Sequence, residues 1–179
     1  MIIREANLHD VQAIARVHVD TWYTTYKGIL PESSLAKISD RQREIAWQKI
    51  IEDTMSSSQF VDVAENDSGQ IIGFANGGKE RTSDRTYKGE LYAIYILEAY
   101  QRQGIGYKLT LYAVNKLSEL GFDSMLVWVL ADNPACRFYE NLCGQKVYEK
   151  QIERGGVILK EVAYGWQNIT TICDRISSR

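Results

Sequence analysis

The sequence predicts an α/β fold with a mixed, mostly antiparallel central sheet and one parallel strand–helix–strand crossover. Two hairpins, Phe60–Gly78 and Gln145–Trp166, indicate the antiparallel part. Between them, Gly89–Leu130 has the pattern of a strand, a helix and a second strand, a connection that is right-handed and joins parallel strands. Repeats and linkers are lacking, so we expect a single domain over residues 1–179, with residues 167–179 as a C-terminal tail.

Composition sets the broad class of the protein. The chain is 45% hydrophobic and 25% charged, as in ordinary folded domains. A net charge of −2 argues against a dedicated nucleic-acid-binding domain, which is usually basic. The start "MIIREANLHD" is no secretory signal, and apolar runs such as Met125–Ala131 are far shorter than the roughly 20 residues that span a membrane. We expect a cytoplasmic protein with neither nucleic acid nor membrane as a partner.

The few cysteines and histidines argue against a metal site. Cys136, Cys143 and Cys173 form no CxxC pair, so we expect reduced thiols. His9 and His18 lie far along the chain from these cysteines, so no zinc site is expected. His18 falls on the apolar face of a helix, where a packed histidine is the expected role.

The N-terminal part begins with a short strand, Ile2–Glu5. Asn7 is placed to cap the helix that follows, and Lys27–Pro31 breaks it. A second helical region is expected from about Ser39 to Asp53. The apolar face of the first helix is marked at three- and four-residue steps by Leu8, Val11, Ile14, His18 and Trp22.

A hairpin and a central strand come next. Phe60–Glu65 alternates as a strand, Asn66–Gly69 forms a turn, and Gln70–Gly78 is the returning strand. A polar loop over Lys79–Lys88 then leads to Gly89–Leu97, which we expect to be central in the sheet.

The C-terminal half continues with a helix whose apolar residues recur from Ile105 to Leu120, and Gly121 can end it. Ser124–Leu130 is an apolar run typical of a strand buried on both faces. Asn133 and Pro134 start a helix that Ala135–Leu142 continues. The last hairpin pairs Gln145–Glu153 with Val157–Trp166 across the turn Arg154–Gly156.

Gly104 and Gly106 stand where the central strand hands over to a helix. A helix N-terminus offers unpaired N–H groups and positive potential, and glycine lets an anion approach the backbone, so this place suits a phosphate or pyrophosphate. A glycine turn that only closes the connection fits these residues equally well. The dinucleotide pattern GxGxxG fails at Leu109, and a P-loop is also missing, so no nucleotide redox cofactor is expected.

The stretch "QRQGIG" does fit the pattern Q/R-x-x-G-x-G/A, at Gln101, Gly104 and Gly106. It resembles the signature of the GNAT superfamily of N-acetyltransferases, in which this loop wraps the pyrophosphate of acetyl-coenzyme A (acetyl-CoA). "GELYAIYIL" before the loop, "WVLADNPACRFYENL" after it and "HVDTWYTTYKGILP" near the start resemble other parts of the family. The resemblance covers roughly Ile2–Trp166 and implies a GNAT-like fold and acetyl transfer to an amine.

Two positions depart from the family pattern. Asp132 stands seven residues before Tyr139, where the family often has asparagine, while Asn133 stands six before it. Cys143 occupies a position after the helix where glycine is usual. The first departure concerns the role of Asn133 as a cofactor contact. The second concerns how the chain leaves the helix, more than the chemistry.

The resemblance implies acetyl-CoA as co-substrate, no metal, and a small-molecule or peptide amine as acceptor; it is compatible with a homodimer. Backbone N–H groups of the loop would hold the pyrophosphate, and a strand edge that splays from its neighbour would pair with the pantetheine arm and polarise the thioester carbonyl. Tyr95 and Ile96 also fit the alternative that they are ordinary core residues of the strand. The implied cofactor-binding residues are Ile94, Tyr95, Ile96, Gln101, Arg102, Gln103, Gly104, Ile105, Gly106, Tyr107 and Asn133.

Two residues are expected to act in catalysis. An amine with a pKa near 10.4 must become neutral, which costs about 4.6 kcal/mol at pH 7, and Glu90 has the spacing of the catalytic glutamate of some GNAT enzymes. A solvated carboxylate, with water and backbone carbonyls as the base, is the alternative. Tyr139 matches the tyrosine of the family's Phe-Tyr pair and would protonate the leaving thiolate; a packed aromatic beside Phe138 is the alternative.

The acceptor pocket is expected between the first two helical segments and the Lys79–Lys88 loop. Trp22, Tyr23 and Tyr26 could line it, or form core. Two rival functions stay open: an acetyl-CoA-binding regulatory domain of low catalytic activity, and an interaction module that docks through its C-terminal tail.

Overall fold

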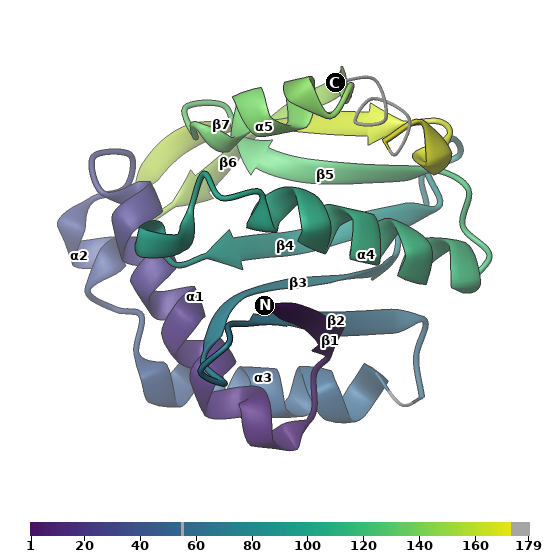
Figure 1. The fold of residues 1–179 in the computed structure, drawn as a ribbon. Coiled ribbons are helices and arrows are strands. Elements are labelled where there is room, and N and C mark those ends of the chain that lie inside the picture. Colours follow the sequence, from purple (N-terminus) through teal and green to yellow (C-terminus); the bar gives the residue numbers. More distant parts are fainter. Residues whose placement is uncertain (55, 173–179) are drawn as a thin grey trace.

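The computed structural model describes residues 1–54 and 56–172, and within them seven strands form one sheet in the order β1-β2-β3-β4-β5-β7-β6 (Figure 1). All neighbouring strands are antiparallel except β4 and β5, which are parallel and joined by α4. The predicted fold class is confirmed. The strands are β1 (Ile2–Glu5), β2 (Gln59–Glu65), β3 (Ile71–Lys79), β4 (Gly89–Ile96), β5 (Met125–Leu130), β6 (Gln145–Arg154) and β7 (Val157–Trp166).

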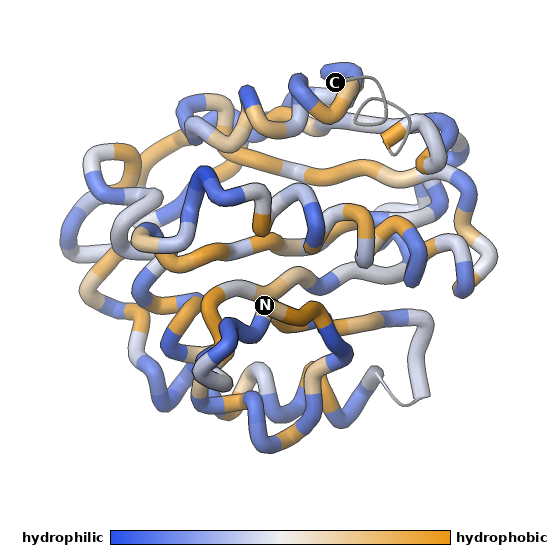
Figure 2. Tube along the Cα trace, viewed as in Figure 1, coloured by the Kyte–Doolittle hydropathy of each residue, from blue (hydrophilic) through white to orange (hydrophobic). Residues whose placement is uncertain are grey.

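Helices cover both faces of the sheet, and each face has its own apolar core. One core packs α4 against the sheet through residues such as Leu109, Ala113 and Leu91. The other packs α1 and α3 against it, with Ile14 and Trp47 among the buried residues. Figure 2 shows the hydrophobic colour concentrated along the central strands. The helices are α1 (Val11–Tyr26), α2 (Glu32–Leu35), α3 (Asp40–Thr54), α4 (Ile105–Glu119) and α5 (Ala135–Asn141), with short 3-10 turns at Leu8–Asp10, Glu98–Tyr100 and Ile169–Ile172.

The predicted elements lie within a few residues of the observed ones, apart from α2. Its single turn, Glu32–Leu35, follows Pro31 and is too short for its apolar residues to show a helical period. The expected C-terminal tail is partly structured, because Ile169 and Ile172 are buried against the core beneath α4. The rest of that tail, residues 173–179 with Cys173, lies outside the described residues.

The parallel strands β4 and β5 pair only at their beginnings. Gly89 is opposite Met125 and Glu90 opposite Leu126, and beyond these positions the two strands are no longer paired. On its other side β4 carries a bulge at Tyr92, because Ala93 is opposite Asn76 while Leu91 is opposite Gly77. The two strand ends therefore separate and leave room between them.

The bulge at Tyr92 also changes which side chains of β4 face which core. Leu91 and Ile94 both face α4, although they are three residues apart, while Ala93 and Tyr95 face α1. Side chains from both faces of β4 therefore come to the place where the strands separate. In the part of the chain that the structure describes, no helix is long and apolar enough to cross a membrane.

Candidate active site

A groove of about 1600 Å³ lies between the separating ends of β4 and β5. The segment before α4 forms one end of the groove, and the C-terminal end of α1 forms the other end. Helix α5 forms one of its sides. Nine of the eleven expected cofactor-binding residues line it. The two others are Ile105, which is buried in the core, and Gln103, whose exposed side chain donates to the Ala99 carbonyl at 3.1 Å. The lining consists chiefly of Thr21, Thr24–Tyr26, Tyr92–Ile96, Gln101, Arg102, Gly104, Gly106, Tyr107, Val127–Val129 and Ala131–Leu142.

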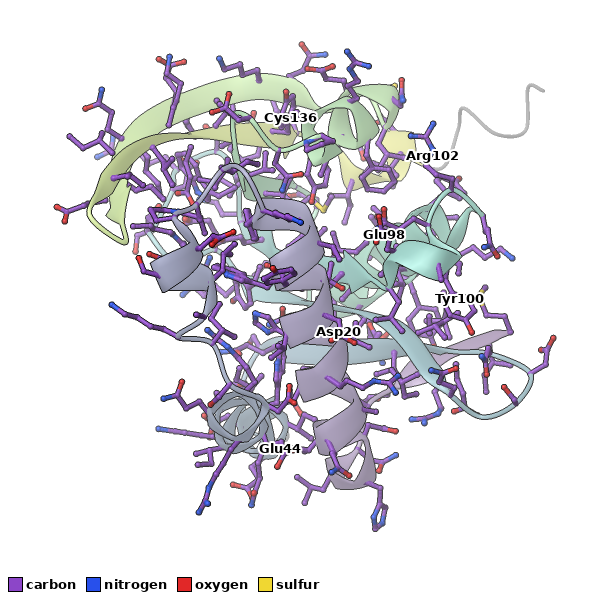
Figure 3. The ribbon with its side chains drawn as sticks, turned by 90° about the vertical axis from the view of Figure 1, so that its left-hand side faces the viewer. Asp20, Glu44, Glu98, Tyr100, Arg102 and Cys136 are labelled. Atoms are coloured by element: carbon purple, nitrogen blue, oxygen red, sulfur yellow. The ribbon has the colours of Figure 1, made fainter. Side chains whose placement is uncertain are left out.

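The loop between β4 and α4 is held in a defined shape. Gln101 donates through Nε2 to the Ile96 carbonyl at 2.9 Å, which ties the loop to the end of β4. Arg102 has a φ of 62° and Gly104 a φ of 79°, both in the left-handed region. Figure 3 shows Glu98, Tyr100 and Arg102 gathered on this segment, on the opposite side of α1 from α2. The loop is thus a formed part of the groove wall.

The same loop presents unpaired donors and open space to the groove. Among the described residues, no carbonyl accepts from the N–H groups of Gln103, Gly104, Ile105 or Gly106. A Cβ added at Gly104 would meet nothing within 4 Å, whereas one at Gly106 would lie 3.2 Å from Ile96 Cδ1. These N–H groups at the start of a 15-residue helix suit an anion such as a pyrophosphate.

Tyr139 of α5 lines the groove and is buried. Its ring lies 5.3 Å from that of Phe138 and 5.9 Å from that of Tyr164. Burial is the main cause that raises the pKa of Tyr139 above its usual value, so its hydroxyl stays protonated throughout the physiological range. The neighbouring Glu140 fixes α5 to β7 by accepting a hydrogen bond from the Tyr164 hydroxyl at 2.7 Å.

Two further tyrosines, Tyr26 and Tyr95, lie at the α1 end of the groove. Burial is the largest cause that raises the pKa of both; hydrogen bonding between the two side chains raises the pKa of Tyr95 further and lowers that of Tyr26. Tyr26 has a hydrogen-bonding interaction with Asn133 as well. The sequence indicates Tyr95 only as a backbone contact, because the bulge that turns its side chain toward α1 leaves no mark in the residue pattern.

Glu90 lies outside the groove, near the beginning of β4. Its carboxylate is buried and accepts from the backbone N–H of Arg81 at 3.2 Å and from Arg81 Nε at 3.1 Å. The Arg81 guanidinium also stacks on Tyr92, with 4.4 Å between Cζ and the ring centroid. The structure therefore does not bring Glu90 together with Tyr139, and a carboxylate held in this way is poorly placed to receive a proton from an amine.

The turn between β6 and β7 approaches the α1 end of the groove, which the sequence does not predict. A Cβ on Gly155 would collide with Ser34 of α2, so the turn and α2 are in close contact. Next to it, Arg154 lies over Trp22, with 5.7 Å between Cζ and the ring centroid. The sequence predicts that the Lys79–Lys88 loop helps to form the acceptor pocket, but none of its residues lines the groove. Its Arg81 stacks on Tyr92, which does line the groove.

The aromatic residues of α1 divide between two hollows. Tyr26 lines the groove, whereas Trp22 and Tyr23 line an adjoining hollow of about 430 Å³ between α1 and α2, which shares Thr24 with the groove. His18 is buried, as expected, with Nδ1 accepting from Trp47 Nε1 at 3.1 Å. Within the described residues, no cluster of three or more His, Cys, Asp or Glu is arranged to hold a metal, and Cys136 and Cys143 are free thiols.

Comparison with known proteins identifies relatives of this chain. Residues 18–145 match the family model described as "Acetyltransferase (GNAT) family". The chain is 41% identical over 170 residues to the uncharacterized N-acetyltransferase YuaI of Bacillus subtilis strain 168, covering 95% of each chain.

Two solved structures share the fold at low identity. The ribosomal-protein-alanine N-acetyltransferase from Brucella melitensis has a TM-score of 0.73 at 19% identity, covering 93% of this chain and 99% of that one. The structure of yncA from Salmonella typhimurium with its cofactor acetyl-CoA has a TM-score of 0.70 at 21% identity, covering 93% of each chain.

Proposed function

Because this chain belongs to the acetyltransferase (GNAT) family and is an N-acetyltransferase enzyme, we propose that it transfers the acetyl group of acetyl-CoA directly to a primary amine of a small molecule or peptide. The observation that carries the proposal is the run of N–H groups from Gln103 to Gly106, which have no acceptor among the described residues and lie where Gly104 and Gly106 line the groove. A pyrophosphate would supply the acceptors that these donors lack. The yncA structure, which shares this fold, holds acetyl-CoA.

The cofactor would be held by backbone rather than side chains. The N–H groups of the loop would bind its pyrophosphate, and the unpaired edge of β4 at Ile94–Ile96 would bind its amide arm. When bound, acetyl-CoA supplies an acyl thioester, and a backbone N–H of the same stretch would polarise the carbonyl. Gly106 lets the helix start approach Ile96 and Phe138 closely, which keeps the loop and β4 at a fixed spacing.

The Tyr139 hydroxyl would assist departure of the thiolate. Because burial raises its pKa, complete proton transfer to a thiolate of pKa about 8.5 is uphill by at least about 2 kcal/mol. We therefore expect the hydroxyl to donate a hydrogen bond that strengthens as charge develops on sulfur. The C–S bond breaks as the C–N bond forms, and the proton that the amine loses passes through water to the thiolate, which leaves as the thiol of coenzyme A.

The amine must lose a proton before or during attack. Glu90 is paired with Arg81 outside the groove, so the structure favours the alternative route through water and backbone carbonyls at the strand ends. The hydroxyls of Tyr26 and Tyr95 lie at the α1 end of the groove, where they can hydrogen-bond to the incoming amine or to a water molecule that takes up its proton.

Calorimetry with acetyl-CoA, followed by a thiol-release assay with an amine panel, tests the proposal. Binding with a stoichiometry of one, together with thiol release that depends on an added amine, is the expected result. Absence of acetyl-CoA binding to the unaltered protein would rule the proposal out.

A further inference from the structure

Arg154 is not part of the groove lining, but it lies over Trp22 beside the α1 end of the groove and brings a positive charge there. Its nearest acidic group among the described residues is Glu161, at 3.8 Å, and Glu161 lies closer to Lys150, at 3.4 Å. One carboxylate is therefore shared by two cations. About half of the Arg154 side chain is exposed, so its guanidinium can be reached from outside.

The position of Arg154 is set by the fold. It is the last residue of β6, and the next residue, Gly155, has a φ of 62° and touches Ser34 of α2. This contact leaves no room for a side chain and holds the turn against α2. The guanidinium then lies over Trp22, and its charge acts on the hydroxyls of Tyr26 and Tyr95 in the groove.

The groove wall that α1 supplies is neutral. Its lining residues are Thr21, Thr24, Thr25 and Tyr26, and none of these carries a charge. The carboxylates that line the groove, Glu98, Asp132 and Glu140, belong to the segments before α4 and before or within α5. The α1 end thus combines hydroxyl groups with the incompletely paired cation of Arg154.

Buried polar groups without a hydrogen-bond partner in the described part of the chain gather on this part of α1. The Nε1–H of Trp22 is buried without a partner in the described part of the chain, as is the hydroxyl of Thr21. His18 Nδ1 accepts from Trp47, so its other nitrogen carries the hydrogen, and that group too is buried without a partner. These atoms are closed to solvent here, and Trp22 must turn to reach a ligand. A carboxylate bound beside Arg154 would offer an acceptor to the Trp22 N–H.

We propose that the acceptor of acetyl transfer is an amine that also carries a carboxylate, such as an amino acid or short peptide, and that Arg154 binds this carboxylate above Trp22 and Tyr26. This inference rests on the proposed function, because it names the substrate class of the same groove. The guanidinium offers two parallel N–H groups to a carboxylate, and the groove hydroxyls receive the amine end. A polyamine would bring a second positive charge toward Arg154, so it is disfavoured.

The first experiment compares matched acceptors. Amino acids are assayed beside their amides and their decarboxylated amines, with dipeptides and spermidine as separate arms. Because charge-assisted hydrogen bonds are worth more than neutral ones, kcat/KM should favour the carboxylate member of a pair by about 10- to 100-fold. Equal rates for acids and amides, or preference for spermidine, would overturn the inference and leave acetyl transfer itself intact. Preference for dipeptides over amino acids would select the peptide source of the carboxylate.

Variants of the hairpin give the matched control. Arg154→Gln should abolish the preference for the carboxylate through KM, and Arg154→Lys should restore part of it, because a cation returns without the planar fork. Lys160→Gln removes an equally exposed cation from the same hairpin, one paired with Glu149, and should change nothing. A preference that survives in Arg154→Gln would contradict the assignment.

A binding measurement covers the case in which no amine of the panel is turned over. The indole N–H signal of Trp22, assigned with Trp22→Phe, is followed by NMR with coenzyme A present. Amino acids should shift it, amides should not, and Arg154→Gln should remove the response. No shift with any amino acid, in a protein that binds acetyl-CoA, would overturn the inference; failure to bind acetyl-CoA would instead refute the proposed function.

Discussion

At the level of single side chains, Tyr139 is the residue on which the proposed chemistry depends most. Replacing Tyr139 with phenylalanine keeps the ring, and so its packing beside Phe138 and Tyr164, while it removes the hydroxyl. We expect kcat to fall by about 10²–10³-fold, the range for removing one hydrogen-bond donor to charge that develops in the transition state, with little change in acetyl-CoA affinity. Single-turnover kinetics measures the chemical step directly.

Product release could mask this effect in steady-state rates, so the single-turnover rate decides. An unchanged rate in Tyr139→Phe would leave Tyr139 as a packed aromatic residue. Because burial raises the pKa of Tyr139, ionisation of this residue should not cause any decrease of activity below about pH 10.

Glu90 is the residue for which structure and sequence pattern point in different directions. Its spacing from Gly104 suggests a catalytic base, yet its carboxylate is buried and bonded to Arg81. We expect Glu90→Gln to weaken the fold by about 1–2 kcal/mol, because hydrogen bonds to a charged group are lost, and to change the single-turnover rate by less than about 10-fold. Thermal unfolding and rapid-quench kinetics check the two parts.

Arg81→Gln is the matched control, because it removes the other partner of the same ion pair. Similar losses of stability in both variants, with chemistry retained, fit a structural role. A loss of 10²-fold or more in the chemical step of Glu90→Gln alone would restore Glu90 as the base.

At the level of elements, the loop before α4 can be tested by comparing the two ends of the helix. Gly104 and Gly121 have φ values of 79° and 84°, and a Cβ at either would meet nothing within 4 Å. Leucine at either position should therefore strain the backbone by a similar amount, about 1–2 kcal/mol. Only Gly104→Leu should weaken acetyl-CoA binding, because its side chain would enter the space next to the unpaired N–H groups.

Calorimetry on the two leucine variants separates these effects. Equal loss of acetyl-CoA binding in Gly104→Leu and Gly121→Leu would mean that the glycine serves only the fold. Equal stability with selective loss of binding in Gly104→Leu is the result that supports the loop as the pyrophosphate site.

The sequence predicts the strands well, because each carries a short and clear pattern. Alternation and turn residues mark both hairpins, and the unbroken apolar run at Met125–Leu130 marks a strand buried on both sides. Cys143 also behaves as its position suggests: its φ of 66° is a conformation that favours glycine, which explains why glycine is usual there.

The missing parts of the site depend on contacts between distant segments. The bulge at Tyr92 arises from pairing with β3, and the approach of Arg154 to Trp22 from packing of the β6–β7 turn on α2. No local periodicity encodes either contact. Glu90 is predicted to be the base only from its spacing before the glycine loop. That spacing cannot show that the Glu90 carboxylate already accepts hydrogen bonds from Arg81.

At the level of the whole molecule, each face of the sheet buries a group, Asp62 on one face and His18 on the other, whose displaced pKa affects stability between pH 4 and 7. Asp62, on β2, is fully buried with both carboxylate oxygens unpaired in the described structure, and burial raises its pKa from 3.8 to about 7. The charges that act on it come from Lys116 and Glu119 of α4 and from Glu5 of β1. On the other face, burial lowers the pKa of His18 from 6.5 to about 4.

These two shifts have opposite effects on the pH dependence of stability. Between pH 4 and 7 the native state keeps the proton of Asp62 that the unfolded chain has lost, so this residue makes stability fall as pH rises. Between pH 4 and 6.5 the unfolded chain protonates His18 while the native state does not, so this residue makes stability rise with pH. Each slope is about 1.4 kcal/mol per pH unit, and over the shared window the two nearly cancel.

Removing one of the two groups should reveal the slope of the other. In Asp62→Asn the falling contribution is lost, so the free energy of unfolding should rise by about 3 kcal/mol from pH 4 to 6.5, while that of the unaltered protein stays nearly level. The buried amide of Asp62→Asn changes the free energy of unfolding by an amount that does not depend on pH. The test is therefore the slope of this free energy against pH, not its absolute value. Urea unfolding at half-unit pH steps measures it. Parallel curves for the two proteins would show that Asp62 titrates in the native state as it does in the unfolded chain, which would contradict the raised pKa.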